Sequence, residues 1–162
     1  MIMKAVIWSR YGPPDVLELR EVEKPVPKDN EVLIRNYATT VTAGDCELRN
    51  LKLPLYYSLP MRLWLGFSKP RGNRIPGTEF AGEIEVAGKD VTRFKPGDQV
   101  FGSTGLGFGA YAEFVCLPEV PVEGTLAIKP SNLTFEEAAS VPFGGKEALH
   151  FLSKANLHNG QK

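Results

Sequence analysis

The feature that most constrains the fold is how often glycine and proline interrupt the chain. The 162 residues include 16 glycines and 13 prolines, well above the roughly 7% and 5% of an average protein. Both residues weaken the interior of helices and strands, so this density favours short strands joined by turns over long helices. At this length we expect one hydrophobic core, or one core with a small appendage.

Hydrophobic patterning predicts the strands individually. Residues 31–41 alternate apolar Val32 and Ile34 with polar neighbours, which is typical of a half-buried strand. The segments that predict strands or strand–turn–strand units are residues 3–8, 16–22, 31–41, 75–88, 94–102 and 110–117. Residues 42–51 lose the period of two and predict a short helix.

Residues 53–67 (LPLYYSLPMRLWLGF) form an apolar and aromatic stretch that contains Pro54 and Pro60. Prolines at this spacing are expected to stop a regular helix. The stretch is also too apolar for a solvated loop, so we expect it to cover something. Two interpretations stay open: a hydrophobic loop folded onto the barrel, or a lid or wall over a binding cleft.

The C-terminal part changes from strand patterns to helix patterns. Thr134 and Glu137 form a capping box at the start of an apolar helix, which Pro142 is expected to end. A second helix is predicted over residues 146–156, after Gly144-Gly145, with its apolar residues on one face. Many strands followed by two helices predict a mainly β fold with helices, in which a barrel-like domain has a helical exit.

Charge and cysteine content exclude several classes of function. Nineteen basic residues balance nineteen acidic ones, which argues against nucleic acid or an anionic membrane as the main partner. Cys46 and Cys116 lie far apart, which predicts two reduced thiols instead of a disulfide framework. Gly105, Gly107 and Gly109 precede a predicted strand, which favours a closure loop over a dinucleotide fingerprint. We find no leader or membrane-spanning pattern and therefore expect a cytoplasmic protein.

Several motifs together resemble the N-terminal half of the medium-chain dehydrogenase/reductase superfamily. They are residues 3–8 (MKAVIW), 31–34 (EVLI), 42–45 (TAGD), 76–82 (PGTEFAG), 94–102 (FKPGDQVFG) and 138–142 (AASVP). The resemblance implies a GroES-like, partly open β-barrel domain over residues 1–128 and a helical connection over residues 129–162. It also implies that the chain is a fragment that lacks the Rossmann domain, with residues 159–162 (NGQK) as the turn before the first Rossmann strand.

Zinc-dependent members of this superfamily hold a catalytic zinc through a cysteine and a histidine in two of these motifs. Thr42 stands at the cysteine position and Thr78 at the histidine position. A threonine hydroxyl is a poor zinc ligand, so the resemblance implies a site without metal. Cys46 lies four positions beyond the ligand position, while His150 and His158 have no ligand partner in the sequence. These three are therefore expected to be ordinary side chains.

The zinc-free branch is similar to quinone oxidoreductases and enone reductases. This resemblance implies hydride transfer from NADPH, or NADH, to a quinone or an α,β-unsaturated carbonyl. The developing substrate oxygen then needs hydrogen-bond donors in place of a metal, in a dry pocket. The candidate residues are Thr42, Asp45 and Thr78 for catalysis, with Arg49 supporting Asp45; Tyr56, Tyr57 and Trp64 for the substrate wall; and Thr42, Phe143 and Gly144 for cofactor binding, mostly completed by the missing domain.

Three charged residues near these motifs carry separate expectations. Glu79 has two interpretations, of which a structural or supporting carboxylate is preferred to a proton carrier. Lys146 and Glu147 stand where relatives often place a threonine toward the nicotinamide. A buried unpaired charge beside the cofactor would be costly, so Phe143 and Gly144 are preferred as the contacts there.

A second hypothesis is a non-catalytic binding or interaction module that uses the GroES-like barrel alone. The absence of a dinucleotide-binding domain and the apolar stretch over residues 53–67 motivate it. Under the enzyme hypothesis the partner is a small-molecule quinone or enone, with neither nucleic acid nor a membrane involved. The fragment alone is then expected to be inactive, because the cleft forms between two domains, and to self-associate through uncovered apolar surface.

Overall fold

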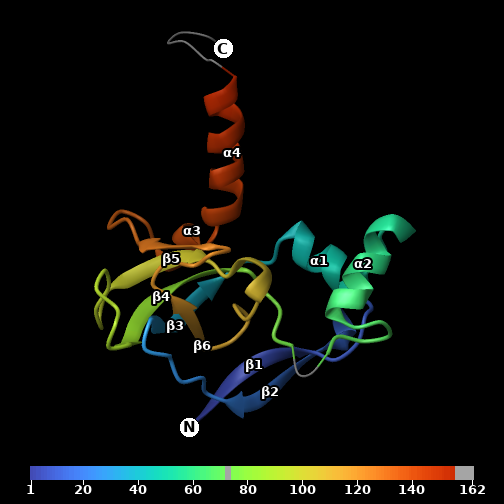
Figure 1. The fold of residues 1–162 in the computed structure, drawn as a ribbon, viewed down its shortest axis with the longest axis horizontal. Helices are drawn as coiled ribbons and strands as arrows, with labels where there is room; N and C mark the ends of the chain where they lie inside the picture. The colour runs from blue at the N-terminus through green and yellow to red at the C-terminus, as the bar shows by residue number, and fades with distance from the viewer. Residues whose placement is uncertain (72–73, 156–162) are drawn as a thin grey trace.

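The computed structural model describes residues 1–71 and 74–155 and contains two antiparallel sheets (Figure 1). A hairpin of β1 and β2 forms the smaller sheet, and the larger sheet has the strand order β6-β3-β4-β5-β7. The strands are β1 (Ile2–Trp8), β2 (Leu17–Glu23), β3 (Glu31–Thr39), β4 (Glu79–Ala87), β5 (Gln99–Ser103), β6 (Phe114–Pro118) and β7 (Thr125–Ile128). The larger sheet curls into a half-barrel with β6 and β7 as its edges, which confirms the expected fold class. The β7 strand was not predicted.

Irregular pairing explains how the larger sheet curls. The register between β3 and β4 shifts twice, between Leu33 and Ile34 and between Asn36 and Ala38. Such bulges increase the local twist and bend a strand. Gly82 lies at one close approach of the strands, where a Cβ atom would stand 2.0 Å from the carbonyl oxygen of Arg35. Only glycine fits there without moving the neighbouring backbone.

Three hydrophobic clusters lie within the described residues, and the smallest packs Ala138 and Ala139 of α3 (Phe135–Ala139) on Ala81 of β4. The first lies inside the half-barrel and joins the central strands; its members are Val32, Ile34, Phe80, Ile84, Phe94, Val100, Ala110, Val115, Leu117 and Leu126. The second joins the hairpin to the helical side of the molecule through Trp8, Val16, Leu51, Leu65 and Phe108. Strands therefore build the first cluster, while helices and loops around one end of the hairpin build the second.

The stretch over residues 53–67 is helical, which corrects the expectation that its prolines prevent a helix. Helix α2 (Leu55–Leu65) contains Pro60 and begins after Pro54, whose carbonyl accepts the first helical N–H groups. Proline is tolerated at a helix start, and Pro60 removes only one hydrogen bond, to the Tyr56 carbonyl. Ser58 and Leu65 are the buried residues of α2, and Leu65 packs in the cluster around Trp8 and Phe108. The stretch therefore packs on the domain along one side and leaves most of its side chains exposed.

The first of the two C-terminal helices begins as predicted, and the second begins earlier in the chain than predicted. Helix α3 (Phe135–Ala139) begins with the expected capping box, in which the Glu137 N–H donates to the Thr134 hydroxyl at 3.2 Å. Pro142 does not end this helix; it starts helix α4 (Pro142–Lys154), which includes both glycines of the pair at 144–145. Proline suits the first turn because its missing N–H would be unpaired there anyway.

Helix α4 stands away from the sheet (Figure 1), and a buried carboxylate holds its base. Glu79, the first residue of β4, is 3% exposed. Its Oε1 atom accepts a hydrogen bond from the Phe143 N–H in the first turn of α4 at 2.7 Å. Its Oε2 atom accepts the Thr40 hydroxyl, and the Thr39 hydroxyl donates to its backbone carbonyl at 2.7 Å. A carboxylate is favourable at a helix N-terminus because of the helix dipole.

Three predicted features of the C-terminus lie outside the described residues. The expected end of the last helix at residue 156, His158 and the turn at residues 159–162 fall outside the described range. No helix in residues 1–71 and 74–155 is long and apolar enough to cross a bilayer. Cys46 in helix α1 (Ala43–Asn50) and Cys116 in β6 are both free thiols.

Replacement of Glu79 should destabilise the junction between sheet and α4. Glu79→Ala leaves the Phe143 N–H and the Thr40 hydroxyl without their acceptor, which costs about 2–3 kcal/mol of unfolding free energy. Glu83→Ala on the same strand is the matched control and should cost less than about 0.5 kcal/mol. Urea unfolding of both variants measures the difference. Equal losses would show that the buried carboxylate does not stabilise this junction.

The two thiols should differ in reactivity. Burial, and then the nearby Glu31 carboxylate, raise the pKa of Cys116 to about 11. Since only the thiolate is a nucleophile, a Cys46→Ser protein should react slowly with a disulfide reagent at pH 8, and its rate should keep rising as the pH approaches 11. Unfolding should restore ordinary reactivity. A native rate that levels off near pH 9 would contradict the raised pKa.

Candidate active site

Helix α1 begins with a reciprocal cap that fixes two of the predicted catalytic residues. The Thr42 N–H and hydroxyl both donate to Oδ2 of Asp45, at 2.8 and 2.7 Å. The Asp45 N–H in turn donates to the Thr42 hydroxyl oxygen at 3.1 Å. The Thr42 hydroxyl proton is therefore held by Asp45, and the hydroxyl oxygen has a fixed position.

Thr78 is held through its backbone, which leaves its hydroxyl free for other contacts. The Thr78 carbonyl accepts the Thr104 N–H at 2.7 Å. Its hydroxyl makes no hydrogen bond within the part of the chain that the structure describes. Thr78 thus differs from Thr42, whose hydroxyl is already engaged with Asp45.

The residue before Thr78 explains why this backbone is positioned so closely. Gly77 has a φ of +87°, and a Cβ atom there would stand 2.1 Å from Cδ1 of Tyr111. The Tyr111 N–H donates to the Pro76 carbonyl at 3.0 Å, and the Ala110 N–H donates to the Gly77 carbonyl at 3.1 Å. A side chain at position 77 would displace the tyrosine ring and the threonine next to it.

One cavity of about 380 Å³ brings the predicted catalytic residues together. Thr42 and Asp45 reach it from the start of α1, Thr78 from the segment before β4, and Phe143 from the start of α4. The remaining lining residues are Gly44, Leu48, Ser103, Gly105, Leu106, Phe108 and Glu123. The cavity therefore combines a few hydroxyl and carboxylate groups with apolar walls, as small-molecule sites do.

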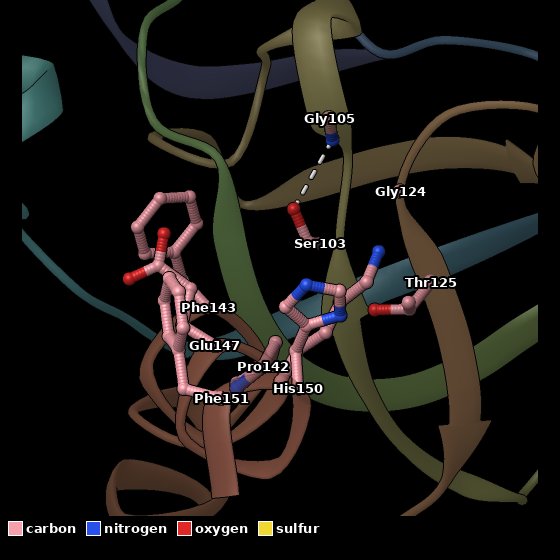
Figure 2. A pocket seen from close by; sticks show the side chains of 10 residues that line it. Ser103, Gly105, Gly124, Thr125, Pro142, Phe143, Glu147, His150 and Phe151 are labelled. Atoms are coloured by element: carbon pink, nitrogen blue, oxygen red, sulfur yellow. Dashed lines mark hydrogen bonds between the residues drawn. The ribbon is translucent and has the colours of Figure 1, made fainter. Parts of the chain in front are cut away.

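A second cavity, of about 440 Å³, lies beside the first along α4 (Figure 2). Phe143 lines both cavities, and the Ser103 hydroxyl accepts the Gly105 N–H at 3.1 Å at their shared wall. Figure 2 shows the His150 ring pointing toward Thr125. The two cavities meet at the junction of β5 with the base of α4.

Two charged residues of α4 border the second cavity. Lys146 and Glu147 line it, and both side chains are exposed in the described chain. The expected cost of a charge beside the bound cofactor stays a prediction. Gly144 lines neither cavity. The space around it is open, because a Cβ atom built there would meet no atom within 4 Å.

The predicted substrate wall lies mostly apart from the cavity. Tyr56 and Tyr57 are on α2, 71% and 60% exposed, and neither lines the cavity that holds Thr78. Trp64 is closer, because its ring centroid lies 6.0 Å from that of Phe108, a lining residue.

Arg49 and Tyr111 also differ from the sequence prediction. Arg49 donates to the Gly12 carbonyl at 3.1 Å and so ties α1 to the hairpin, instead of bonding to Asp45. Tyr111 was not predicted at all. Its hydroxyl is buried without a hydrogen-bond partner among the described atoms, and burial and the Asp45 carboxylate raise its pKa above the usual value. No local pattern in the sequence places this ring against Gly77.

The described residues contain no group of three or more His, Cys, Asp and Glu side chains placed to hold a metal ion. Thr42 and Thr78 instead bring hydroxyl groups to the cavity, and one of the two hydroxyls is free to donate. The arrangement can orient and stabilise a small polar group on an otherwise apolar substrate.

Comparison with curated proteins identifies relatives along nearly the whole chain. The quinone oxidoreductase of Pseudomonas aeruginosa is 35% identical over 159 residues, which cover 98% of this chain and 43% of that protein. The human quinone oxidoreductase is 33% identical over 141 residues, or 86% of this chain and 37% of the relative. The 2-methylene-furan-3-one reductase of Solanum lycopersicum is 32% identical over 168 residues, or 98% and 39%. The chain thus spans less than half the length of these relatives.

Solved structures agree with the sequence relatives. The quinone oxidoreductase of Coxiella burnetii superposes with a TM-score of 0.81 at 30% identity, over 99% of this chain and 47% of that one. The Escherichia coli quinone oxidoreductase, solved in complex with NADPH, gives a TM-score of 0.75 at 25% identity, over 94% and 41%. Residues 28–124 match the family described as the alcohol dehydrogenase GroES-like domain. Because this match covers more than half of the sequence, the chain belongs to the alcohol dehydrogenase GroES-like domain family of the medium-chain dehydrogenase/reductase superfamily.

Proposed function

We propose that this chain is the N-terminal catalytic part of a zinc-independent oxidoreductase that transfers hydride from NADPH, or NADH, to a quinone or an α,β-unsaturated carbonyl. Residues 1–128 would form the catalytic domain and residues 129–162 the connection to a dinucleotide-binding domain. The observation that carries the proposal is the cavity in which Thr42, Asp45, Thr78 and Phe143 meet. The quinone oxidoreductases and the furanone reductase among the relatives support this substrate class.

Thr78 is the proposed donor to the substrate oxygen. Reduction of a quinone or enone places negative charge on that oxygen, and a positioned hydroxyl stabilises it more than it stabilises the neutral ground state. The Thr78 hydroxyl is free to donate, while the Thr42 hydroxyl is bonded to Asp45. Thr42 and Asp45 would therefore shape the site and accept from a bound group, and the proton that completes the reduction would come from bulk solvent.

The base of α4 is the proposed contact for the cofactor. Phe143 lines both cavities, and the space around Gly144 is open, so a flat ring fits against this turn. Thr42, Phe143 and Gly144 would hold the nicotinamide end, and that ring supplies the hydride when it is bound. Leu48, Leu106 and Phe108 would exclude water from the reacting atoms, and the polar residues of the site keep fixed orientations.

We also propose low turnover for these residues alone, self-association and a cytoplasmic location. Alone, these residues should show little turnover, because less than half of the length of the related enzymes is present. Exposed apolar residues of α4, among them Leu149 and Phe151, favour self-association when nothing covers them. A cytoplasmic location is proposed for the full-length protein.

The test is hydride transfer by the full-length gene product with a panel of quinones and enones, followed by NADPH absorbance. Thr78→Val should lower kcat by about 10²-fold and leave the KM for NADPH unchanged, because the lost hydrogen bond matters in the transition state. Thr78→Ser should restore most of the rate. Thr92→Val removes an exposed hydroxyl far from the cavity and is the matched control.

Two results would overturn the proposal. Full activity in Thr78→Val would remove Thr78 from the reaction, and stoichiometric zinc whose removal abolishes turnover would remove the zinc-independent mechanism. If the wild-type protein reduces no member of the panel with either cofactor, the proposed reaction class is wrong.

A further inference from the structure

The α2 segment, defined here as residues 48–71, differs in charge from the rest of the chain. It contains five basic residues, Arg49, Lys52, Arg62, Lys69 and Arg71, and no acidic residue. The chain as a whole has a net charge of zero. The zero net charge of the whole chain therefore results from this basic segment and an acidic excess in the remaining residues.

The same segment exposes an unusual amount of apolar surface. Leu55, Tyr56, Leu63 and Phe67 are each more than 60% exposed, and α2 projects from the right-hand side of the molecule in Figure 1, apart from the larger sheet. Single exposed apolar residues are normal in a folded domain, whereas a contiguous group on one short helix marks an interaction surface.

The basic residues frame this apolar helix. Lys52 precedes α2, while Lys69 and Arg71 follow it, and all three are exposed. None of the three takes part in an ion pair with another described residue. Arg62, within the helix, donates to the Phe67 carbonyl at 2.7 Å and lies 4.9 Å from the Tyr11 ring centroid. Uncompensated positive charge therefore stands at both ends of the exposed apolar surface.

We propose that the α2 segment binds the surface of an anionic lipid bilayer. Leucine, tyrosine and tryptophan side chains of α2 would enter the boundary between headgroups and acyl chains, and the flanking lysines and arginine would contact lipid phosphates. An 11-residue helix is about 16 Å long, well short of the roughly 30 Å hydrocarbon core. The helix therefore lies in the plane of the interface.

The composition of the exposed surface favours lipid over another polyanion. A nucleic acid would use the cations and stack on aromatic rings, but it offers little to exposed leucines such as Leu55 and Leu63. A bilayer interface accepts aliphatic and aromatic groups together, with tyrosine and tryptophan at the headgroup level. This inference does not depend on the proposed reaction.

The experiment is sedimentation of the full-length gene product with vesicles of phosphatidylcholine alone or mixed with phosphatidylglycerol, at low and high salt. We expect binding only to the mixed vesicles, and weaker binding at high salt. The triple variant Lys52→Gln, Lys69→Gln, Arg71→Gln should lower the partition coefficient by about 10²-fold. The control Arg93→Gln, Lys95→Gln, Lys154→Gln removes the same charge from exposed positions elsewhere and should bind as wild type.

A second measurement distinguishes insertion from simple charge attraction. Trp64 is 41% exposed and Trp8 is 2% exposed, so a blue shift of tryptophan emission on vesicle addition that disappears in Trp64→Phe reports Trp64. Tyr56→Ser with Leu63→Ser should abolish binding while circular dichroism and thermal unfolding stay unchanged, because both residues are exposed. Equal binding to neutral vesicles, no binding at all, or equal effects of the two triple variants would overturn the proposal. Association of α2 with a second copy or with a polynucleotide, without vesicle binding, would also overturn it.

Discussion

The candidate site depends on one buried carboxylate, Glu79, which forms no ion pair with any residue in the described ranges. Glu79 begins the central strand β4 and accepts hydrogen bonds from the base of α4 and from the Thr40 hydroxyl. Burial of an unpaired charge is expensive, and here a helix N-terminus and a hydroxyl offset that cost. Because Glu79 follows Thr78 directly, this tie sets the distance between the free hydroxyl and the wall formed by Phe143. The interpretation of Glu79 as structural agrees with these contacts.

Short-range contacts hold one side of the cavity, and long-range contacts hold the other. Thr42 and Asp45 satisfy each other within one helical turn and hold one side of the cavity without help from distant residues. Thr78 depends on the Tyr111 ring, which packs on Gly77 and closes the space behind the backbone. Hydrogen bonds therefore hold one side of the site and ring packing holds the other.

The sequence could predict what is decided locally. Alternation in residues 31–41 and the capping box at Thr134 correctly predicted β3 and the start of α3, because neighbouring residues determine both. The helix through Pro60 was missed, since a single proline removes one helical hydrogen bond and does not by itself end the helix. The contact of Tyr111 with Gly77 was not predictable, because only the curl of the sheet brings them together. Motif resemblance named Thr42, Asp45, Thr78 and Phe143, and the structure places these four around one cavity.

The glycine pair at the base of α4 has a mechanical consequence. Glu79 clamps the Phe143 N–H, and Gly144 and Gly145 follow immediately, where the backbone bends at the lowest energetic cost. Beyond them the helix continues to Lys154, so that the 13-residue element is about 20 Å long. Helix α4 can therefore rotate as a rod about the glycine pair, which lies next to its fixed end. A rotation of a few degrees at the glycines becomes a displacement of an ångström or more at the tip, while the clamped cavity wall stays in place.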